Sequence, residues 1–163
     1  MRTIDLEKQL LILIENSQRI IYKVCYIYAN NDYTLEELYQ ETVINLWKSY
    51  PRFRGDCKES TWVYRIAMCT CVTYFRRSSV RVECMPITSN IHELPACDDG
   101  ENEKLDRLYV LINRLGKLER ALILLWLEER SYQEISEILG LSKSNVAVKL
   151  NRVKDKLKRM SNR

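Results

Sequence analysis

The feature that most constrains this chain is the stretch from Ser131 to Met160, where two helical patterns meet at one glycine. Ser131 followed by Glu134 forms a capping box, which starts a helix by satisfying two of its free backbone amides. Gly140 can adopt the left-handed conformation that ends a helix, and Ser142 can cap the next one. Apolar residues in that second helix repeat at i, i+4, i+7 and i+11: Val146, Leu150, Val153 and Leu157. The spacing predicts a helix-turn-helix whose second helix turns this apolar side inward.

The outward side of this second helix is polar and positively charged. Residues 130–163 carry nine basic and three acidic side chains, whereas residues 78–129 carry six basic and ten acidic ones. A basic helix held by a tight turn can enter the major groove of DNA and reach base edges there. The residues that share this side are Ser144, Asn145, Val148, Lys149 and Arg152. We expect this unit to bind DNA; the alternative is a packed helical hairpin with a solvated basic side.

A second constellation lies between Pro51 and Arg77, where aromatic and basic side chains alternate. Aromatic rings stack on unpaired bases while basic side chains follow the phosphates, so this mixture suits single-stranded DNA. The aromatic residues are Phe53, Trp62, Tyr64, Tyr74 and Phe75, and the basic ones are Arg52, Arg54, Lys58, Arg65, Arg76 and Arg77. The alternative is that Trp62, Tyr64 and Phe75 belong to the core, and for Trp62 the residue types favour neither interpretation. Phe53 lies in a polar loop beside a glycine, which suits a core position less well.

The helix before this constellation has an acidic and amide-rich side. Thr34 and Glu37 form its capping box, and Pro51 ends it. Its outward residues are Glu36, Glu37, Gln40, Glu41 and Asn45, with Trp47 near the end. Such a side suits a basic protein partner rather than DNA, although a solvated face is the alternative that residue types alone favour.

The remaining pattern is helical throughout and predicts an all-α fold. Further helices are expected at 4–29, from Ser60 or Thr61 to Arg77, at 105–114 and at 117–129. Two small helical domains, residues 1–79 and 104–163, are then joined by a flexible acidic linker at residues 80–103.

Composition excludes several functional classes. The longest apolar run, ALILLWL at residues 121–127, is far shorter than a membrane span. Six cysteines without a CxxC pair, and a single histidine, His92, favour reduced thiols in a cytoplasmic protein over a metal site or cofactor. No clustered carboxylate metal site and no phosphate-binding glycine loop are present, so we expect no enzyme.

Two blocks of this sequence resemble the bacterial sigma factors of RNA polymerase, in particular the small extracytoplasmic-function group. The first block comprises LYQETVINLW at residues 38–47, FRGD at 53–56, TWVYRIA at 61–67 and the pair Arg76-Arg77. The second runs from Tyr132 to Leu157. With their flanking helices, the blocks cover nearly the whole chain outside the linker.

The resemblance implies a role for each block. Polymerase-binding residues, at the clamp helices of the largest subunit, would be Glu37, Gln40, Glu41, Asn45 and Trp47. Residues for the minus-ten element would be Phe53, Arg54, Gly55, Asp56, Trp62, Arg65, Cys69, Arg76 and Arg77. Residues for the minus-thirty-five element would be Ser144, Asn145, Ala147, Val148, Lys149 and Arg152. The apolar surface around Leu118, Leu122 and Leu125 would meet the flap of the second-largest subunit.

The resemblance also implies core RNA polymerase and promoter DNA as partners, and an anti-sigma protein as a further one. The chain departs from the family pattern at Cys69, Ser136 and Gly116, where asparagine, alanine and proline are common. A stand-alone helix-turn-helix regulator, which binds a palindromic operator without polymerase, is the alternative. It would need neither the aromatic-basic loop nor the acidic-amide helix.

Overall fold

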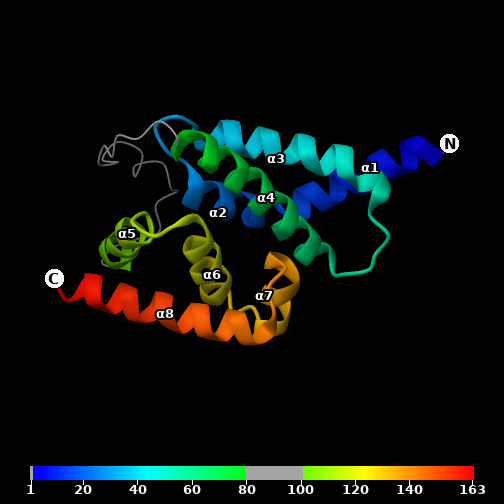
Figure 1. Ribbon diagram of the computed structural model, residues 1–163. Helices are drawn as coiled ribbons and strands as arrows, with labels where there is room; N and C mark the ends of the chain where they lie inside the picture. Colours follow the sequence, from blue (N-terminus) through cyan, green and yellow to red (C-terminus); the bar gives the residue numbers. More distant parts are fainter. Residues whose placement is uncertain (1, 80–100) are drawn as a thin grey trace.

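The computed structural model describes residues 2–79 and 101–163, and within them every regular element is a helix. The elements are α1 (Arg2–Asn16), α2 (Gln18–Tyr28), α3 (Leu35–Ser49), the short 3-10 helix η1 (Tyr50–Arg52), α4 (Glu59–Ser79), α5 (Glu101–Ile112), α6 (Lys117–Leu127), α7 (Tyr132–Leu139) and α8 (Lys143–Ser161). Helices α1–α4 form one layer and α5–α8 a second layer against it (Figure 1). The predicted all-α fold is confirmed.

The N-terminal layer is built on α2, which packs against both α3 and α4. Its core includes Ile21, Val24, Leu38, Leu46 and Tyr64, all fully buried. The single helix expected at residues 4–29 is wrong, because the chain breaks into α1 and α2 at Ser17. There the Ser17 amide donates to Ile14 O at 3.1 Å, a bond to the third residue back that interrupts the regular helical ladder.

The beginnings of α3 and α4 differ in how well local sequence predicted them. At α3 the Thr34 amide donates to Glu37 Oε2 at 2.9 Å and the Glu37 amide to Thr34 Oγ1 at 3.2 Å, so the capping box is confirmed. The α4 helix already includes Glu59, so neither Ser60 nor Thr61 precedes it as a cap. Thr61 is instead buried.

The C-terminal layer contains the expected helix-turn-helix, α7 and α8, packed against α6. Helix α5 begins at Glu101, earlier than the expected residue 105, and ends at Ile112. The predicted flexible linker lies mostly outside the described residues, since only 101–103 are described and these are helical. No described helix has the length and apolarity needed to cross a membrane.

The two layers are joined by polar contacts that follow no local pattern. Buried Arg120 of α6 donates to Ile27 O at 3.0 Å, at the end of α2, and its guanidinium lies 4.8 Å from the centre of the Phe75 ring. Lys23 of α2 pairs with Glu128, just after α6, at 2.5 Å. Helix α6 and the residue after it are therefore held directly against α2 and α4 of the N-terminal layer.

Candidate nucleic-acid and polymerase interfaces

The turn between α7 and α8 has the geometry that a helix-turn-helix requires. Gly140 ends α7 with φ of 68°, a left-handed conformation that costs glycine little. The Ser142 hydroxyl accepts from the Asn145 amide at 3.2 Å and so caps α8. Ser136, noted above as a departure from the family pattern, donates its hydroxyl to Leu141 O at 2.6 Å. This bond ties α7 to the turn in a way that alanine at the same position could not.

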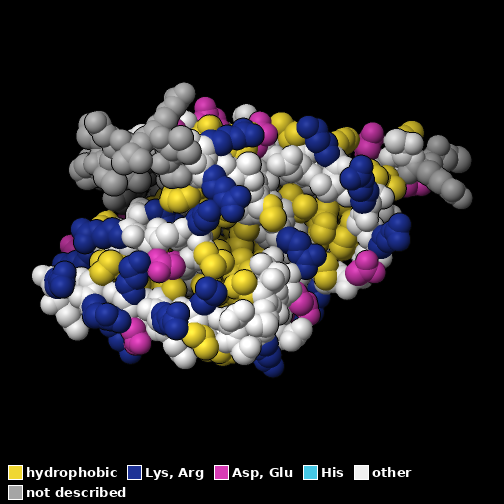
Figure 2. Space-filling view, viewed as in Figure 1, with side chains coloured by type: hydrophobic (Ala, Val, Ile, Leu, Met, Phe, Trp, Pro, Cys, Tyr) yellow, Lys and Arg dark blue, Asp and Glu magenta, His cyan; other side chains and the backbone are white. Residues whose placement is uncertain are grey.

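The outward side of α8 is open to solvent, as the sequence predicted. Val146, Leu150 and Val153 are buried, which fixes the rotation of the helix. Of the predicted contact residues, Ser144, Asn145, Val148 and Arg152 are exposed, and Ala147 and Lys149 are half-buried. Lys and Arg side chains lie along the length of α8 at the lower edge of Figure 2.

In the N-terminal layer, three rings cluster where η1 meets α4. The Phe53 ring lies 4.8 Å from that of Trp62, and Tyr50 lies 6.0 Å from Trp62, centre to centre. Trp62 is only 8% exposed, so for this residue the core interpretation is correct. Phe53 is half-buried and its ring lies against Trp62, so it is packed on the core although its polar loop suited a core position less well. Of the two rings, that of Phe53 is the more exposed.

The other predicted minus-ten residues lie at the surface, in the loop before α4 and further along α4. Arg54, Gly55 and Asp56 are exposed, and Gly55 has φ of 78° with open space where a Cβ would lie. Cys69 is exposed on the outer side of α4, and Arg76 and Arg77 are exposed in the last turn of the helix for which side chains are described.

Arg65 is the exception, because it already has a partner. Its Nη2 donates to Glu137 O of α7 at 2.5 Å. Lys58, just before α4 and seven residues before Arg65, pairs with Glu134 of α7 at 3.3 Å. Hydrogen bonding by the Ser131 amide, assisted by Lys58, lowers the pKa of the Glu134 carboxyl. Helix α7 therefore rests on the part of α4 that carries Arg65.

The predicted polymerase-binding side of α3 is partly engaged in the fold. Glu37 is occupied by the cap, and Asn45 Nδ2 donates to Thr70 Oγ1 of α4 at 2.9 Å. Glu41 is half-buried, and burial together with the neighbouring Glu41 carboxylate raises the pKa of the Tyr74 hydroxyl. Gln40 remains exposed, and exposed Ile44 lies beside it on the same side of the helix, a residue that the polar pattern did not indicate.

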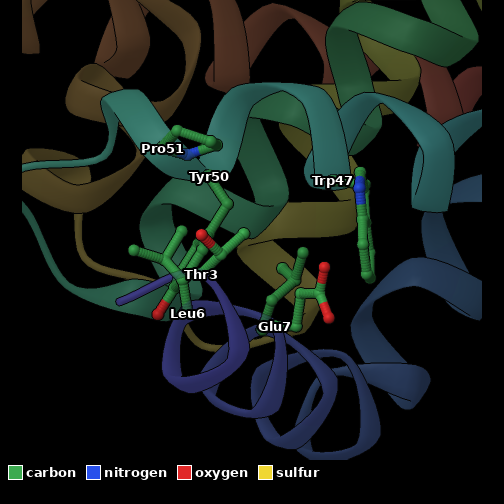
Figure 3. A pocket seen from close by; sticks show the side chains of 7 residues that line it. Thr3, Leu6, Glu7, Trp47, Tyr50 and Pro51 are labelled. Atoms are coloured by element: carbon green, nitrogen blue, oxygen red, sulfur yellow. The ribbon is translucent and has the colours of Figure 1, made fainter. Parts of the chain in front are cut away.

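Trp47 is 44% exposed and lines a groove of about 290 Å³ between α1 and the end of α3. Thr3, Leu6 and Glu7 of α1 form the opposite wall, and Tyr50 and Pro51 close the end, as Figure 3 shows. Trp47 thus extends the exposed side of α3 towards α1.

Two family models match this chain in the order and at the places of the two blocks. The model for sigma-70 region 2 matches residues 13–81, and the model for sigma-70 region 4 matches residues 105–157. The RNA polymerase sigma factor YlaC of Bacillus subtilis is 33% identical over 133 residues, which are 77% of this chain and 76% of that protein. The chain belongs to the sigma-70 family of RNA polymerase sigma factors. The ECF RNA polymerase sigma factor SigX of Bacillus subtilis is 23% identical over 150 residues, 86% of this chain and 77% of that protein.

Solved sigma-factor structures share the fold of this extracytoplasmic-function sigma factor. The chain of CnrH, solved in complex with the cytosolic domain of CnrY, superposes with a TM-score of 0.69 at 18% identity, covering 96% of this chain and 89% of that one. The sigma factor RpoE of Bartonella quintana, crystallised with the anti-sigma factor NepR, gives a TM-score of 0.70 at 16% identity, covering 97% of each chain.

The matches decide between the functional classes considered from the sequence. Both blocks belong to a transcription initiation factor, which binds core polymerase and directs promoter recognition and is not an enzyme. They do not support a stand-alone operator-binding regulator.

The structure corrects the expected flap-binding surface of this sigma factor. Leu122 and Leu125 are 1% and 0% exposed, and Leu118 is half-buried. The exposed apolar residues on α6 are Trp126 and Leu127, at its C-terminal end. Helical spacing placed the first set on one side but could not tell that this side packs inward.

The cysteines of the described residues are free thiols: Cys25, Cys57, Cys69 and Cys71. Cys71 and Cys25 are buried, with 3.8 Å between their sulfurs. Among the described residues no three His, Cys, Asp or Glu side chains could hold a metal ion, and His92 lies outside them.

Proposed function

We propose that this sigma factor reads the minus-thirty-five element with the N-terminal half of α8. The observation that carries this assignment is the rotation of α8, which buries Val146, Leu150 and Val153 and leaves Asn145, Val148 and Arg152 exposed. Arginine can hold guanine by two parallel hydrogen bonds in the major groove, and Val148 can contact a thymine methyl.

For the minus-ten element we propose capture of an unpaired base at the loop 53–57 and the first turns of α4. Phe53 offers a ring at the surface, and Arg54, Arg76 and Arg77 supply positive charge for the phosphates. Trp62 supports Phe53 from below through their ring contact. Cys69, in the place where the family commonly has asparagine, would tune which base is accepted.

For binding to core polymerase we propose the side of α3 that carries Gln40, Glu41, Ile44 and Trp47. Acidic and amide groups there surround exposed apolar side chains, which is the usual make-up of a protein-binding surface. Glu37 and Asn45 contribute by holding the helix, since both are bonded within the fold.

The double variant Gln40→Ala/Glu41→Lys tests the core-binding assignment. We expect weaker binding to purified core polymerase with unchanged circular dichroism, because neither residue carries the α3 cap. Glu15→Lys, an equally large charge change at an exposed residue of α1, is the control. Wild-type core affinity in the double variant would remove this side of α3 from the interface.

Run-off transcription with core polymerase tests the proposal as a whole. We expect a transcript from a cognate promoter only when the chain is added, and none from a template whose minus-thirty-five element is scrambled. Specific binding of the chain alone to a palindromic site, without any effect on core polymerase, would contradict the proposal.

The anti-sigma factor NepR bound to RpoE suggests regulation of the same kind for this chain. We propose that an anti-sigma protein holds the two layers together, with α7 still resting on α4. Because core polymerase and promoter DNA meet in the bacterial cytoplasm, the proposal places the chain there.

A further inference from the structure

A row of cationic side chains continues the outward side of α8 beyond the residues assigned to base reading. Arg152, Lys156 and Arg159 are exposed and follow one another at spacings of four and three residues. With 100° between successive residues of a helix, they lie on the same side of α8 as Asn145 and Val148. Arg163, just past the end of the helix, continues the row.

The four cationic residues of this row line one shallow groove. A hollow of about 610 Å³ is lined by Arg152, Lys156, Arg159 and Arg163 together with Met160 and Glu119. Glu119 pairs with Lys156 at 3.0 Å, and this one carboxylate faces four cations. The groove therefore carries a net positive charge that an anion of extended shape would neutralise.

Other basic residues of α8 are set apart from this row. Lys154 lies with its Nζ 4.1 Å from the centre of the Trp126 ring, on a different side of the helix. Lys158 is exposed, but it lies about 200° around the helix from Lys156. The rotation of α8 therefore places Lys156 on a different side of the helix from Lys154 and Lys158.

The length of α8 decides what this row can reach on DNA. The helix has 19 residues and is therefore about 28 Å long, while the major groove is about 12 Å wide. A recognition helix contacts base edges with its N-terminal residues, so its C-terminal half has to pass over the backbone that borders the groove. The phosphates there are anions spaced along an extended strand.

We propose that Arg159 and Arg163, with Lys156, form a phosphate track that grips the DNA backbone beside the minus-thirty-five element. This inference rests on the proposed function, because it takes α8 as the reader of that element. Guanidinium groups bind phosphate oxygens in pairs of parallel hydrogen bonds, which favours arginine at the two outer positions. The track adds affinity and fixes the angle of α8 but reads no sequence.

Adjacent residues on different sides of α8 provide a matched test. Arg159→Gln and Lys158→Gln each remove one exposed charge at nearly the same distance along the helix. The affinity of the holoenzyme, with each variant, is measured on promoter DNA over a range of salt concentrations. Each lost phosphate contact lowers the slope of log affinity against log salt by about 0.9, which is a factor of about three over a fourfold change in salt.

We expect the reduced slope for Arg159→Gln, a further reduction for Arg159→Gln/Arg163→Gln, and the wild-type slope for Lys158→Gln. Duplexes with a neutral methylphosphonate at single positions around the element then locate the contact. One such substitution should weaken the wild type but not the Arg159→Gln variant. An unchanged slope, or no position at which the two effects coincide, overturns the inference.

The same experiment separates the phosphate track from the proposed function. If wild-type holoenzyme does not discriminate a matched from a scrambled minus-thirty-five element, the assignment of α8 fails. If it discriminates and Arg159→Gln matches Lys158→Gln in slope, only the phosphate track fails. Loss of transcription in Arg159→Gln with unchanged DNA binding would mean that the row binds an acidic protein, which also overturns the inference.

Discussion

Some polar residues predicted to bind a partner are already hydrogen-bonded within this sigma factor, whereas others are exposed. Asn45 bonds to Thr70, and Arg65 bonds to Glu137 O, although both have the residue types expected of a binding surface. Gln40, Asn145 and Arg152 are exposed instead. A side chain bonded within the protein has to give up that bond before it can bind a partner, so the exposed residues are the stronger candidates.

Arg152→Ala is expected to relax base discrimination in the minus-thirty-five element. Loss of a guanine contact should cost about 1–3 kcal/mol on the matched element and much less on one that lacks the guanine. Holoenzyme affinities on matched and single-base-changed elements measure the effect. Equal weakening on every sequence would make Arg152 a phosphate contact and leave base reading to Asn145, Val148 or Lys149.

Phe53→Ala is expected to impair promoter opening more than promoter binding. One lost base stack should cost about 1–3 kcal/mol, and permanganate reactivity of unpaired thymines reports the opening. Because the Phe53 ring also covers Trp62, some loss of thermal stability should accompany it. An equal defect on a pre-melted template would assign Phe53 to the fold alone.

At the scale of elements, α7 and the turn that follows it contain most of the helix-capping and turn residues of the C-terminal half. The Ser131 cap, the left-handed Gly140, the Ser142 cap and the Ser136 bond to Leu141 O fall within twelve residues. Each fixes one end or one angle of a helix, so together they orient the exposed side of α8.

Gly140→Ala is expected to lower the free energy of unfolding by about 1 kcal/mol, and the Tm by about 2–4 °C. Gly140 has φ of 68° and open space around the position of a Cβ, so the cost is backbone strain without a clash. Thermal unfolding measures it, and Gly140→Asn, which tolerates this conformation better, is the control. Equal destabilisation by alanine and asparagine would mean that the left-handed conformation is not the reason.

At the scale of the whole molecule, contacts between the two layers occupy residues beside the surface proposed to bind the minus-ten element. Helix α7 rests on α4, and Arg65 and Lys58 are both bonded to it. If the loop 53–57 and α8 bind two separate promoter elements, as proposed, we expect the layers to move apart on DNA. The arrangement described is therefore a closed one.

Charge reversal at the Lys23–Glu128 pair is expected to favour separation of the layers. The pair joins α2 to the segment after α6 at 2.5 Å, and Lys23→Glu would place two carboxylates there. Exposed pairs contribute about 0.2–1 kcal/mol, so a partial increase in the radius of gyration by small-angle X-ray scattering is expected. Restoration by Lys23→Glu/Glu128→Lys is the control, and an unchanged radius in all variants would show that this pair does not hold the layers.

The sequence by itself determined the all-helical class, the caps at Thr34, Ser131 and Ser142, and the turn at Gly140, but not the break at Ser17 or the start of α4. These features depend on hydrogen bonds and backbone conformations within three or four residues, which local spacing reveals. Together with the two blocks of residues, they were sufficient to indicate the family, and the two DNA-reading regions stay predictions.

Only the tertiary structure decided which sides of these elements remain open. Trp62 is buried in the core, and so are Leu122 and Leu125. Arg65 donates a hydrogen bond to the backbone carbonyl of a residue 72 positions later in the chain. The rotation of α8 also separated Lys156 from Lys154, whose charge lies on the Trp126 ring. The physical reason is that burial and pairing depend on packing between segments distant in sequence, and no pattern of near neighbours records that packing.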